Sequence, residues 1–280
     1  MSACAPWRCP NCDRTVATPF CPVCGERELQ ARDLSLRGIL DQVIRSFGVD
    51  GRAMRSFRCL LTRPGALTAA YRSGQRKPYL GPLSLFLIAN LLFFAVQSVS
   101  DVKVFSTSLD MHLHDQAWSG AAQQLVTRRL VTSGRTLERY TPVFNQAVRG
   151  HAKSLIGLMV LPFALLPALL FRAAGRPFAL HVVFSLHFHA FLLLLLCVPL
   201  LAVAVNGWLG GAHIPSPRVD DALSILLLSI SAIYLHIAVG IVYGARGVLR
   251  MVKVLGLTVA LAGIFLAYRF VLLPITLYTT

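Results

Sequence analysis

Five long apolar stretches constrain the fold of this chain more than any other feature. They cover about Leu80–Val99, Ser154–Phe171, Leu180–Val205, Ala222–Tyr243 and Val254–Leu277. Each is close to or above the roughly 20 residues that a helix needs to cross a bilayer. None contains Asp or Glu, as the cost of placing charge in hydrocarbon requires. The pattern predicts an all-α integral membrane protein with about five transmembrane helices.

The composition excludes a soluble globular protein. Of the 280 residues, 55% are hydrophobic and only 14% are charged, and the mean hydropathy is +0.63. Soluble domains carry about 25% charged residues. The net charge of +15 would favour nucleic acid binding in a soluble protein, but here its distribution indicates membrane topology instead.

The basic residues are concentrated on one side of the predicted spans. Eighteen of the 27 Lys and Arg residues fall in 1–79, 172–179 and 244–253, loops that alternate consistently with the others. Cytoplasmic loops carry the excess of Lys and Arg, so we expect a cytoplasmic N-terminus and an extracytoplasmic C-terminus. The first 25 residues contain no apolar core typical of a signal peptide. The strong preference for Arg over Lys indicates a bacterial source, and hence the bacterial inner membrane.

Two CxxC pairs stand near the N-terminus, ahead of the spans. Cys9, Cys12, Cys21 and Cys24 have the spacing of a four-thiolate zinc site. A reducing cytoplasm favours metal binding over disulfides. Four protein ligands fill a tetrahedral zinc, so the site is expected to be structural, in a zinc-ribbon knuckle over residues 1–30. Between the cysteines only Arg14 is basic and only Phe20 is aromatic, too few for nucleic acid. We expect a protein partner.

Residues 31–79 form a basic amphipathic linker. Its apolar positions predict short helices from about residue 33 to 47, over Met54–Leu61 and over Ala66–Arg72. They lie on the anionic inner leaflet, pack on the bundle, or both. The cations that would face lipid headgroups are Arg45, Arg52, Arg55, Arg58, Arg63, Arg72, Arg76 and Lys77.

The bundle itself occupies residues 80–280, and its loop at about 100–153 is too polar to span. Apolar residues recur in its second half, which predicts one or two extracytoplasmic amphipathic helices resting on the bundle. Pro142 is expected to kink or end one of them.

Four histidines lie inside the predicted third and fourth spans: His181, His187, His189 and His236. At about 1.5 Å per residue, His187, His189 and His236 lie roughly 10–14 Å from the cytoplasmic face. His187 and His189 point about 160° apart at the 100° per residue of a helix, so both cannot face His236. Three interpretations remain open: structural hydrogen bonds, a lipid or substrate pocket, and a haem or metal site.

Other polar residues of the spans could join such a pocket. Asn90 lies midway along the first span, Tyr234 lies in the fourth, and Arg269 lies near the outer end of the fifth. Arg269 either snorkels to the outer interface or binds an acidic group. GxSxG, Walker and HExxH motifs are absent, which favours a protein that is not an enzyme.

Several segments together resemble a known family. They are Arg63-Pro64-Gly65, the run from Tyr71 to Leu80, the run Leu161–Leu166, the His-rich run His181–Phe191, and Tyr268-Arg269-Phe270. These segments and the cysteine knuckle are similar to the DUF3667 family, bacterial membrane proteins of unknown function with an N-terminal zinc ribbon. The resemblance implies an architecture and no activity.

The sequence therefore favours a non-catalytic, membrane-anchored interaction or assembly factor whose zinc knuckle docks a cytoplasmic protein. The alternative is a transporter or membrane enzyme with an inner-leaflet histidine pocket that binds a lipid or haem. The two hypotheses place function in different parts of the chain, the cysteines or the histidines.

Overall fold

The structure is a computed structural model that describes residues 6–9, 12–24, 51–75, 78–100, 102, 104–210 and 217–280. It divides into two compact units, Met1–Met54 and Arg55–Thr280, and each is described by itself. The helix predicted from about residue 33 to 47 lies outside the described residues, as do the predicted surface cations Arg45, Arg76 and Lys77.

The described part of the first unit is a knuckle on two short antiparallel strands. β1 (Trp7–Arg8) pairs with β2 (Thr15–Val16). The connection turns through Asp13, whose φ of 58° lies in the left-handed region that Asp tolerates better than most residues. Backbone bonds of 2.9 Å close this turn, because Asp13 N–H donates to Cys9 O and Cys9 N–H donates to Arg14 O.

Very little apolar surface holds the knuckle together. Its buried residues are Trp7, Cys9, Val16 and Cys21. Trp7 Nε1–H donates to Thr18 O at 2.8 Å, which satisfies the polar end of the indole. A core of this size cannot offset the conformational entropy of folding, so the knuckle needs another source of stability.

The rest of the described chain is helical, which confirms the predicted fold class. Four helices are long and apolar enough to cross a membrane, namely α4, α9, α10 from Asp221 onward, and α11, and a bent pair formed by α7 and α8 would make a fifth. The helices are α2 (Gly51–Thr62), α3 (Ala66–Arg72), α4 (Pro82–Ser100), α5 (Leu109–His114), α6 (Ser119–Ser133), α7 (Leu137–Leu155), α8 (Val160–Leu170), α9 (Phe178–Trp208), α10 (Pro217–Tyr243) and α11 (Gly247–Thr279).

The second predicted span is not one straight helix. Where a single helix over Ser154–Phe171 was expected, a 3₁₀ segment (Ile156–Met159) separates α7 from α8, and the two halves are bent by 56°. Pro162 supplies the reason, since it has no N–H and its ring would clash with the carbonyl of Leu158 in a continuous helix. The 11 residues of α8 extend only about 16 Å, roughly half of a hydrocarbon core.

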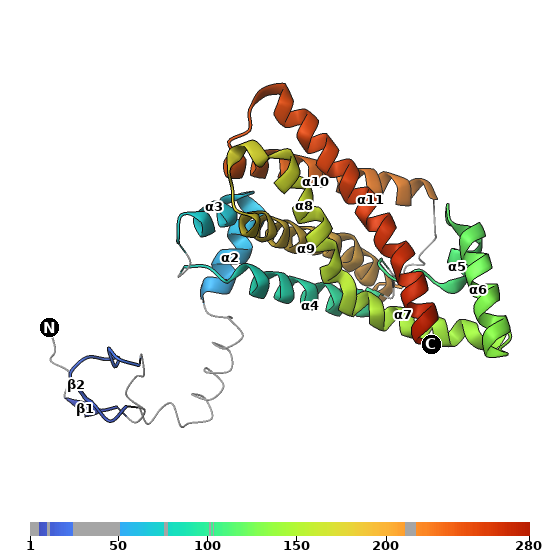
Figure 1. Ribbon diagram of the computed structural model, residues 1–280, viewed down its shortest axis with the longest axis horizontal. Helices are drawn as coiled ribbons and strands as arrows, with labels where there is room; N and C mark the ends of the chain where they lie inside the picture. The colour runs from blue at the N-terminus through green and yellow to red at the C-terminus, as the bar shows by residue number, and fades with distance from the viewer. Residues whose placement is uncertain are drawn as a thin grey trace. The chain divides into compact units, whose positions relative to one another are not determined.

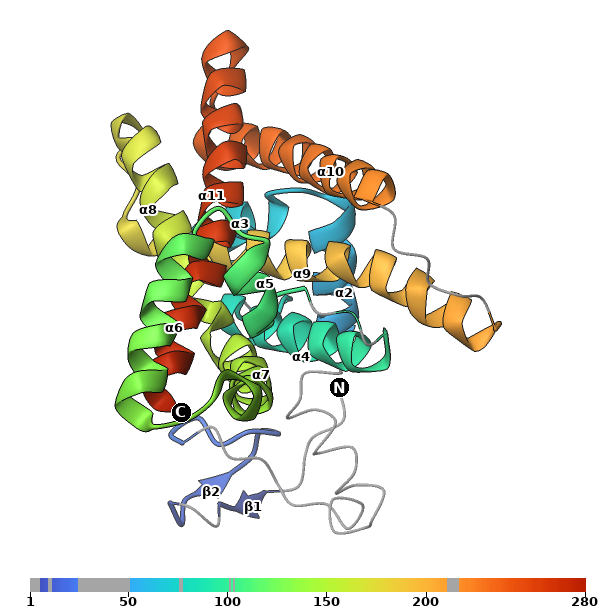
Figure 2. The same cartoon turned by 90° about the vertical axis from the view of Figure 1, so that its right-hand side faces the viewer.

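The helices of the second unit alternate in direction, so their connections gather at two ends (Figures 1 and 2). One end holds α2, α3 and the connections from α8 to α9 and from α10 to α11. We call it the basic end, because its segments 51–81, 171–177 and 244–253 contain no Asp or Glu. The opposite end holds α5, α6 and the C-terminus. Residues 51–75, 171–177 and 244–253, which belong to loops predicted to share a side, therefore lie at one end of the bundle.

Helices α2 and α3 pack on the bundle at the basic end. Leu60 and Leu67 are buried in the main core, and α3 contacts α9 and α10. Gly65 makes the close approach possible, because a Cβ there would lie 2.8 Å from Ala238 Cα, and its φ is +80°. The described linker arginines remain exposed on the outside of this packing: Arg52, Arg55, Arg58, Arg63 and Arg72.

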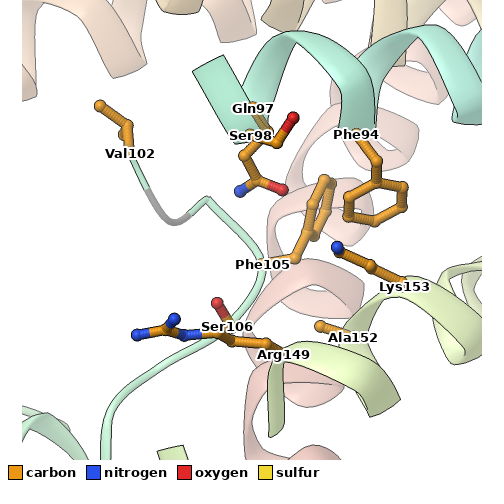
Figure 3. Close-up of a pocket in the computed structure, with 9 residues that line it drawn as sticks. All are labelled: Phe94, Gln97, Ser98, Val102, Phe105, Ser106, Arg149, Ala152 and Lys153. Atoms are coloured by element: carbon orange, nitrogen blue, oxygen red, sulfur yellow. The ribbon is translucent and has the colours of Figure 1, made fainter. Parts of the chain in front are cut away.

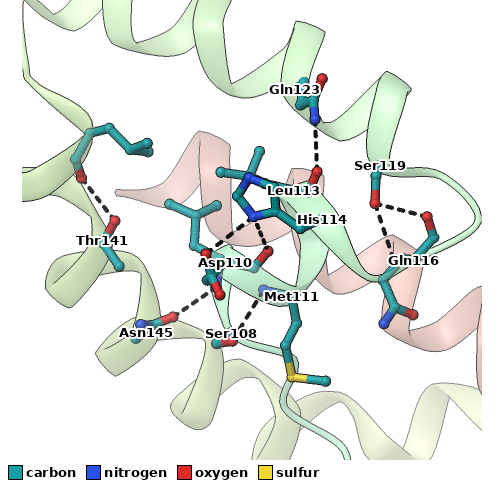
Figure 4. Close-up of polar contacts among 12 residues, drawn as sticks. Ser108, Asp110, Met111, Leu113, His114, Gln116, Ser119, Gln123, Thr141 and Asn145 are labelled. Atoms are coloured by element: carbon teal, nitrogen blue, oxygen red, sulfur yellow. Dashed lines mark hydrogen bonds and ion pairs between the residues drawn. The ribbon is translucent and has the colours of Figure 1, made fainter.

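At the opposite end, the segment from 104 to 155 folds over the bundle. A cavity separates the end of α4 from the end of α7 (Figure 3). Polar contacts tie the short helices together (Figure 4): Leu109 N–H donates to Asn145 Oδ1 at 2.9 Å, and Gln123 Nε2 donates to Leu113 O at 2.8 Å. Pro142 lies inside α7, so the helix does not end there as one reading of the sequence had it.

Candidate functional site

The four cysteines of the knuckle converge on one point. Their sulfur atoms all lie within 4.8 Å of one another. Three Sγ–Sγ distances are 3.4 Å for Cys9–Cys24, 3.5 Å for Cys12–Cys21 and 3.8 Å for Cys12–Cys24. A tetrahedron of thiolates at the usual Zn–S distance of about 2.3 Å has edges of about 3.8 Å. The geometry of the four sulfurs therefore fits a metal ion of zinc's size and coordination.

The turn after the third cysteine prepares its sulfur for a metal. Backbone N–H groups of Cys24 and Val23 lower the pKa of the Cys21 thiol to about 6. The thiolate is the form that binds metal, so these backbone donors favour the binding-competent state of Cys21 itself. All four ligand positions of a tetrahedral ion are supplied by sulfur, which is the arrangement of a structural site.

A groove of about 260 Å³ runs beside the cluster on the surface of the knuckle. One wall is β2 with its flanking residues, and the other is the turn that carries Cys21. Val23 is 56% exposed at the groove, and Phe20 close by in the same turn is 60% exposed. The full lining is Arg14, Thr15, Val16, Ala17, Thr18, Cys21, Pro22 and Val23. The groove therefore presents exposed apolar side chains, Val23 and the nearby Phe20, beside one lining cation, Arg14.

Three of the four predicted membrane histidines are buried in α9, in three separate environments. His181 Nδ1 bonds Tyr243 Oη at 2.9 Å and its ring stacks on the tyrosine. His187 Nδ1 bonds Thr68 Oγ1 at 2.9 Å. His189 Nδ1 lies 2.8 Å from its own helix's Ser185 carbonyl. These contacts join α9 to α10, to α3 and to its own preceding turn.

The fourth predicted histidine, His236, makes its described hydrogen bonds through its backbone and not through its imidazole. Its carbonyl accepts hydrogen bonds from the Arg250 guanidinium, which fits over Gly240, where a Cβ would lie 2.6 Å from the guanidinium carbon. The side chain is only half-buried. Among the described contacts, none joins His236 to His187 or His189.

A small cavity of about 80 Å³ does reach one of the histidines, His187. His187 lines this cavity while its Nδ1 is held by Thr68 Oγ1. The volume suits a few water-sized groups and is far below that of a macrocycle such as haem. Its other lining residues belong to α3 and the connection to α4: Leu67, Tyr71, Gln75, Tyr79, Leu80 and Gly81.

The remaining predicted pocket residues are dispersed through the bundle. Asn90 Oδ1 is buried without a partner among the described residues. Tyr234 stacks on Phe191 with ring centroids 3.8 Å apart. Arg269 Nε donates to Thr107 Oγ1 at 2.7 Å, which ties this arginine to the segment before α5, and no ion pair of Arg269 is found among the described residues.

Two features of the bundle were not expected from the sequence. At the opposite end, fully buried His112 accepts a hydrogen bond from Trp118 Nε1 at 3.1 Å. At the basic end, cations cap helix carbonyls: Arg72 donates to Val242 O at 2.8 Å and Lys253 donates to Leu170 O at 2.7 Å. Cations at helix C-termini are favourable. Their partners are distant in sequence, so no local pattern could identify them.

The fold and the cluster define a class: an α-helical protein with helices that could span a membrane, preceded in the chain by a four-cysteine knuckle whose geometry fits a metal ion. The model of the family described as "Protein of unknown function (DUF3667)" matches residues 50–94, which confirms the predicted resemblance. The matched segment comprises α2, α3 and most of α4, the part of the chain that lines the His187 cavity and wedges Gly65 against α10. No curated protein and no solved structure gives a significant match.

Proposed function

We propose that this protein is a membrane-anchored interaction factor of the bacterial inner membrane, and that its zinc-loaded knuckle docks a cytoplasmic protein. The groove beside Cys21 is the observation that carries the proposal. An extended segment of a partner can lie along β2 and place an apolar side chain between Pro22 and Val23. The closed four-sulfur geometry supports a structural role for the metal, which shapes the groove rather than reacting in it.

The charge of the bundle supports the proposed orientation. The basic end carries exposed arginines without a single carboxylate in its segments, which suits an anionic inner leaflet. Since residues 51–62 continue directly from the N-terminal part of the chain into the basic end, the knuckle belongs to the cytoplasmic side in this orientation. Reporter fusions at the N- and C-termini test it, with cytoplasmic activity expected at the first and extracytoplasmic activity at the second.

Site-specific photo-crosslinking of the full-length protein in native membranes tests the docking. A photoreactive residue at Val23 is expected to give one discrete adduct, and the adduct should disappear when Cys9→Ser and Cys12→Ser remove the metal. The matched control places the same probe at Arg128 on α6, an exposed position on the bundle. Equal adducts with and without the metal ligands, or a pattern shared with position 128, would rule out metal-dependent docking.

A second candidate function rests on the cavity beside His187. Its polar groups and its position in the family-matched segment favour a small polar ligand at the basic end. His187→Ala and His236→Ala separate this reading from the first, because only His187 lines the cavity. If the His187 variant abolishes the cellular function while the Cys9→Ser variant leaves it intact, the pocket and not the knuckle carries the function. An absorbance spectrum of the purified protein without a Soret band would exclude haem as the ligand.

A further inference from the structure

The cavity between α4 and α7 lies at the opposite end of the bundle from the proposed inner-leaflet surface and measures about 210 Å³. Three segments build it: the last two turns of α4, the connection that follows, and the last two turns of α7 (Figure 3). The lining residues are Phe94, Gln97, Ser98, Val102, Phe105, Ser106, Arg149, Ala152 and Lys153.

The part of the lining that the structure describes is positively charged. Arg149 and Lys153 stand one helical turn apart on the same face of α7, and both are exposed. None of the nine lining residues is acidic, and neither cation forms an ion pair among the described residues. Gln97 and Ser106 add neutral hydrogen-bonding groups, whereas the Ser98 hydroxyl already donates to Ala95 O at 2.7 Å. Two cations with neutral donors around them form a site for an anion with several oxygen atoms.

The floor of the cavity is held rigidly. Phe105 is 1% exposed, and its ring lies 5.3 Å from the rings of Phe93 and Phe265. Behind α7, Tyr268 Oη donates to Ala152 O at 2.8 Å and fixes the turn between the two cations. A ligand therefore meets a preformed wall and loses less entropy when it binds.

The position of the cavity along α4 matches the membrane surface. α4 has 19 residues and extends about 28 Å, close to the thickness of the hydrocarbon core. Gln97 and Ser98 lie in its last turn, at headgroup depth, and Phe94 lies one turn deeper. The volume is below the roughly 300 Å³ of the smallest drug-sized pockets, so it accommodates a headgroup-sized fragment.

We propose that this cavity binds a phosphate-bearing group, with Arg149 and Lys153 neutralising its charge and Gln97 and Ser106 completing its hydrogen bonds. A phospholipid headgroup and inorganic phosphate offer the same chemistry. Phe94 and Val102 line the cavity as well, and they would contact the glycerol and upper acyl carbons of a lipid, which free phosphate lacks.

Native mass spectrometry of the detergent-purified full-length protein tests the proposal. The probes are phosphatidylglycerol, a diacylglycerol that lacks phosphate, and inorganic phosphate. The wild-type protein is expected to retain one phosphatidylglycerol and no diacylglycerol. Arg149→Gln with Lys153→Gln should weaken retention at least ten-fold. The matched control, Arg128→Gln with Arg139→Gln, removes the same charge from exposed positions on α6 and α7 outside the cavity and should retain the lipid.

Equal retention by the cavity variant and the control would overturn the proposal, as would equal binding of diacylglycerol. Because both cations are exposed, an unchanged melting temperature is expected for both double variants and shows that the bundle is intact. Phe94→Ala identifies the source of the phosphate. If Phe94→Ala loses the lipid and inorganic phosphate does not displace lipid from the wild-type protein, the site binds a lipid headgroup. If inorganic phosphate binds the wild-type protein and Phe94→Ala equally and displaces the lipid, the site binds free phosphate.

Discussion

The knuckle and the bundle differ in the interactions that stabilise each of them internally. Among the described residues, the knuckle buries four, two of them cysteines of the cluster, whereas one continuous core includes residues of every helix from α2 to α11. In the first, we expect a metal ion bound by the four sulfurs to supply the folding energy. In the second, packed apolar side chains, aromatic stacks and interhelical hydrogen bonds supply it. Different treatments should therefore unfold the two units.

Metal removal is expected to have the largest effect and to act on the knuckle alone. Cys9→Ser with Cys12→Ser should reduce bound zinc from about one per chain to nearly none, and it should expose the knuckle to proteases. Circular dichroism should show the helical bundle unchanged. Cys59→Ser, at a buried cysteine of α2, is the control and should keep the zinc. Simultaneous melting of the bundle would mean that the two units are coupled.

Gly65→Ala is expected to destabilise the bundle and to leave the knuckle unchanged. The new Cβ would meet the Ala238 backbone at 2.8 Å and strain a φ of +80°, so we expect a loss of about 3 kcal/mol and a melting temperature lower by roughly 10 °C. Bound zinc should not change. Gly74→Ala is the matched control, because its φ is +82° but nothing lies within 4 Å of its Cβ position. If both variants melt alike, backbone strain alone accounts for the loss.

Acid should weaken the bundle through His112. Burial, together with a smaller effect of the nearby Arg269 charge, lowers the pKa of this histidine to about 4. The unfolded chain takes up a proton near pH 6.5 and the folded chain does not. Stability therefore falls as the pH drops from about 6.5 to 4, by at most about 3 kcal/mol. His112→Gln should remove this part of the pH dependence in thermal melts between pH 4 and 7, and an unchanged slope would contradict it.

Arg72→Gln should give the smallest effect, about 1–2 kcal/mol, because it removes a charge-assisted hydrogen bond to Val242 O at the end of α10. Arg58→Gln removes the same charge from an exposed position on α2 and should be nearly silent. Thermal melts of both variants in the same detergent make the comparison. Equal destabilisation would show that net charge at the basic end matters more than this contact.

Local patterns predicted the elements well. The short helix at 66–72 has the predicted bounds because Pro64-Gly65 and Ser73-Gly74 punctuate it on both sides. Four apolar stretches lie almost entirely within single long helices, although α11 begins at Gly247, well before the predicted start at Val254. The bend before α8 follows from Pro162. The prediction missed this local signal because it rested on the length of the apolar stretch. The two-residue strands of the knuckle are too short to leave a periodic pattern.

The candidate site was predictable only in part. The four cysteines carry their spacing in the sequence, and the structure brings their sulfurs together. The partners of the histidines could not be predicted, since Thr68 lies 119 residues from His187 and Tyr243 lies 62 residues from His181. Helical periodicity gives the direction of a side chain around its own helix. It does not give the neighbouring helix that the side chain meets.

X-ray absorption at the zinc edge tests the central claim most directly, that a closed metal site folds and shapes the knuckle. The full-length protein, expressed with its N-terminus in the cytoplasm, should contain about one zinc per chain in a shell of four sulfur atoms at about 2.3 Å. A shell of mixed sulfur and oxygen would indicate an open site available for chemistry. Absence of zinc from intact protein would contradict the account of the knuckle.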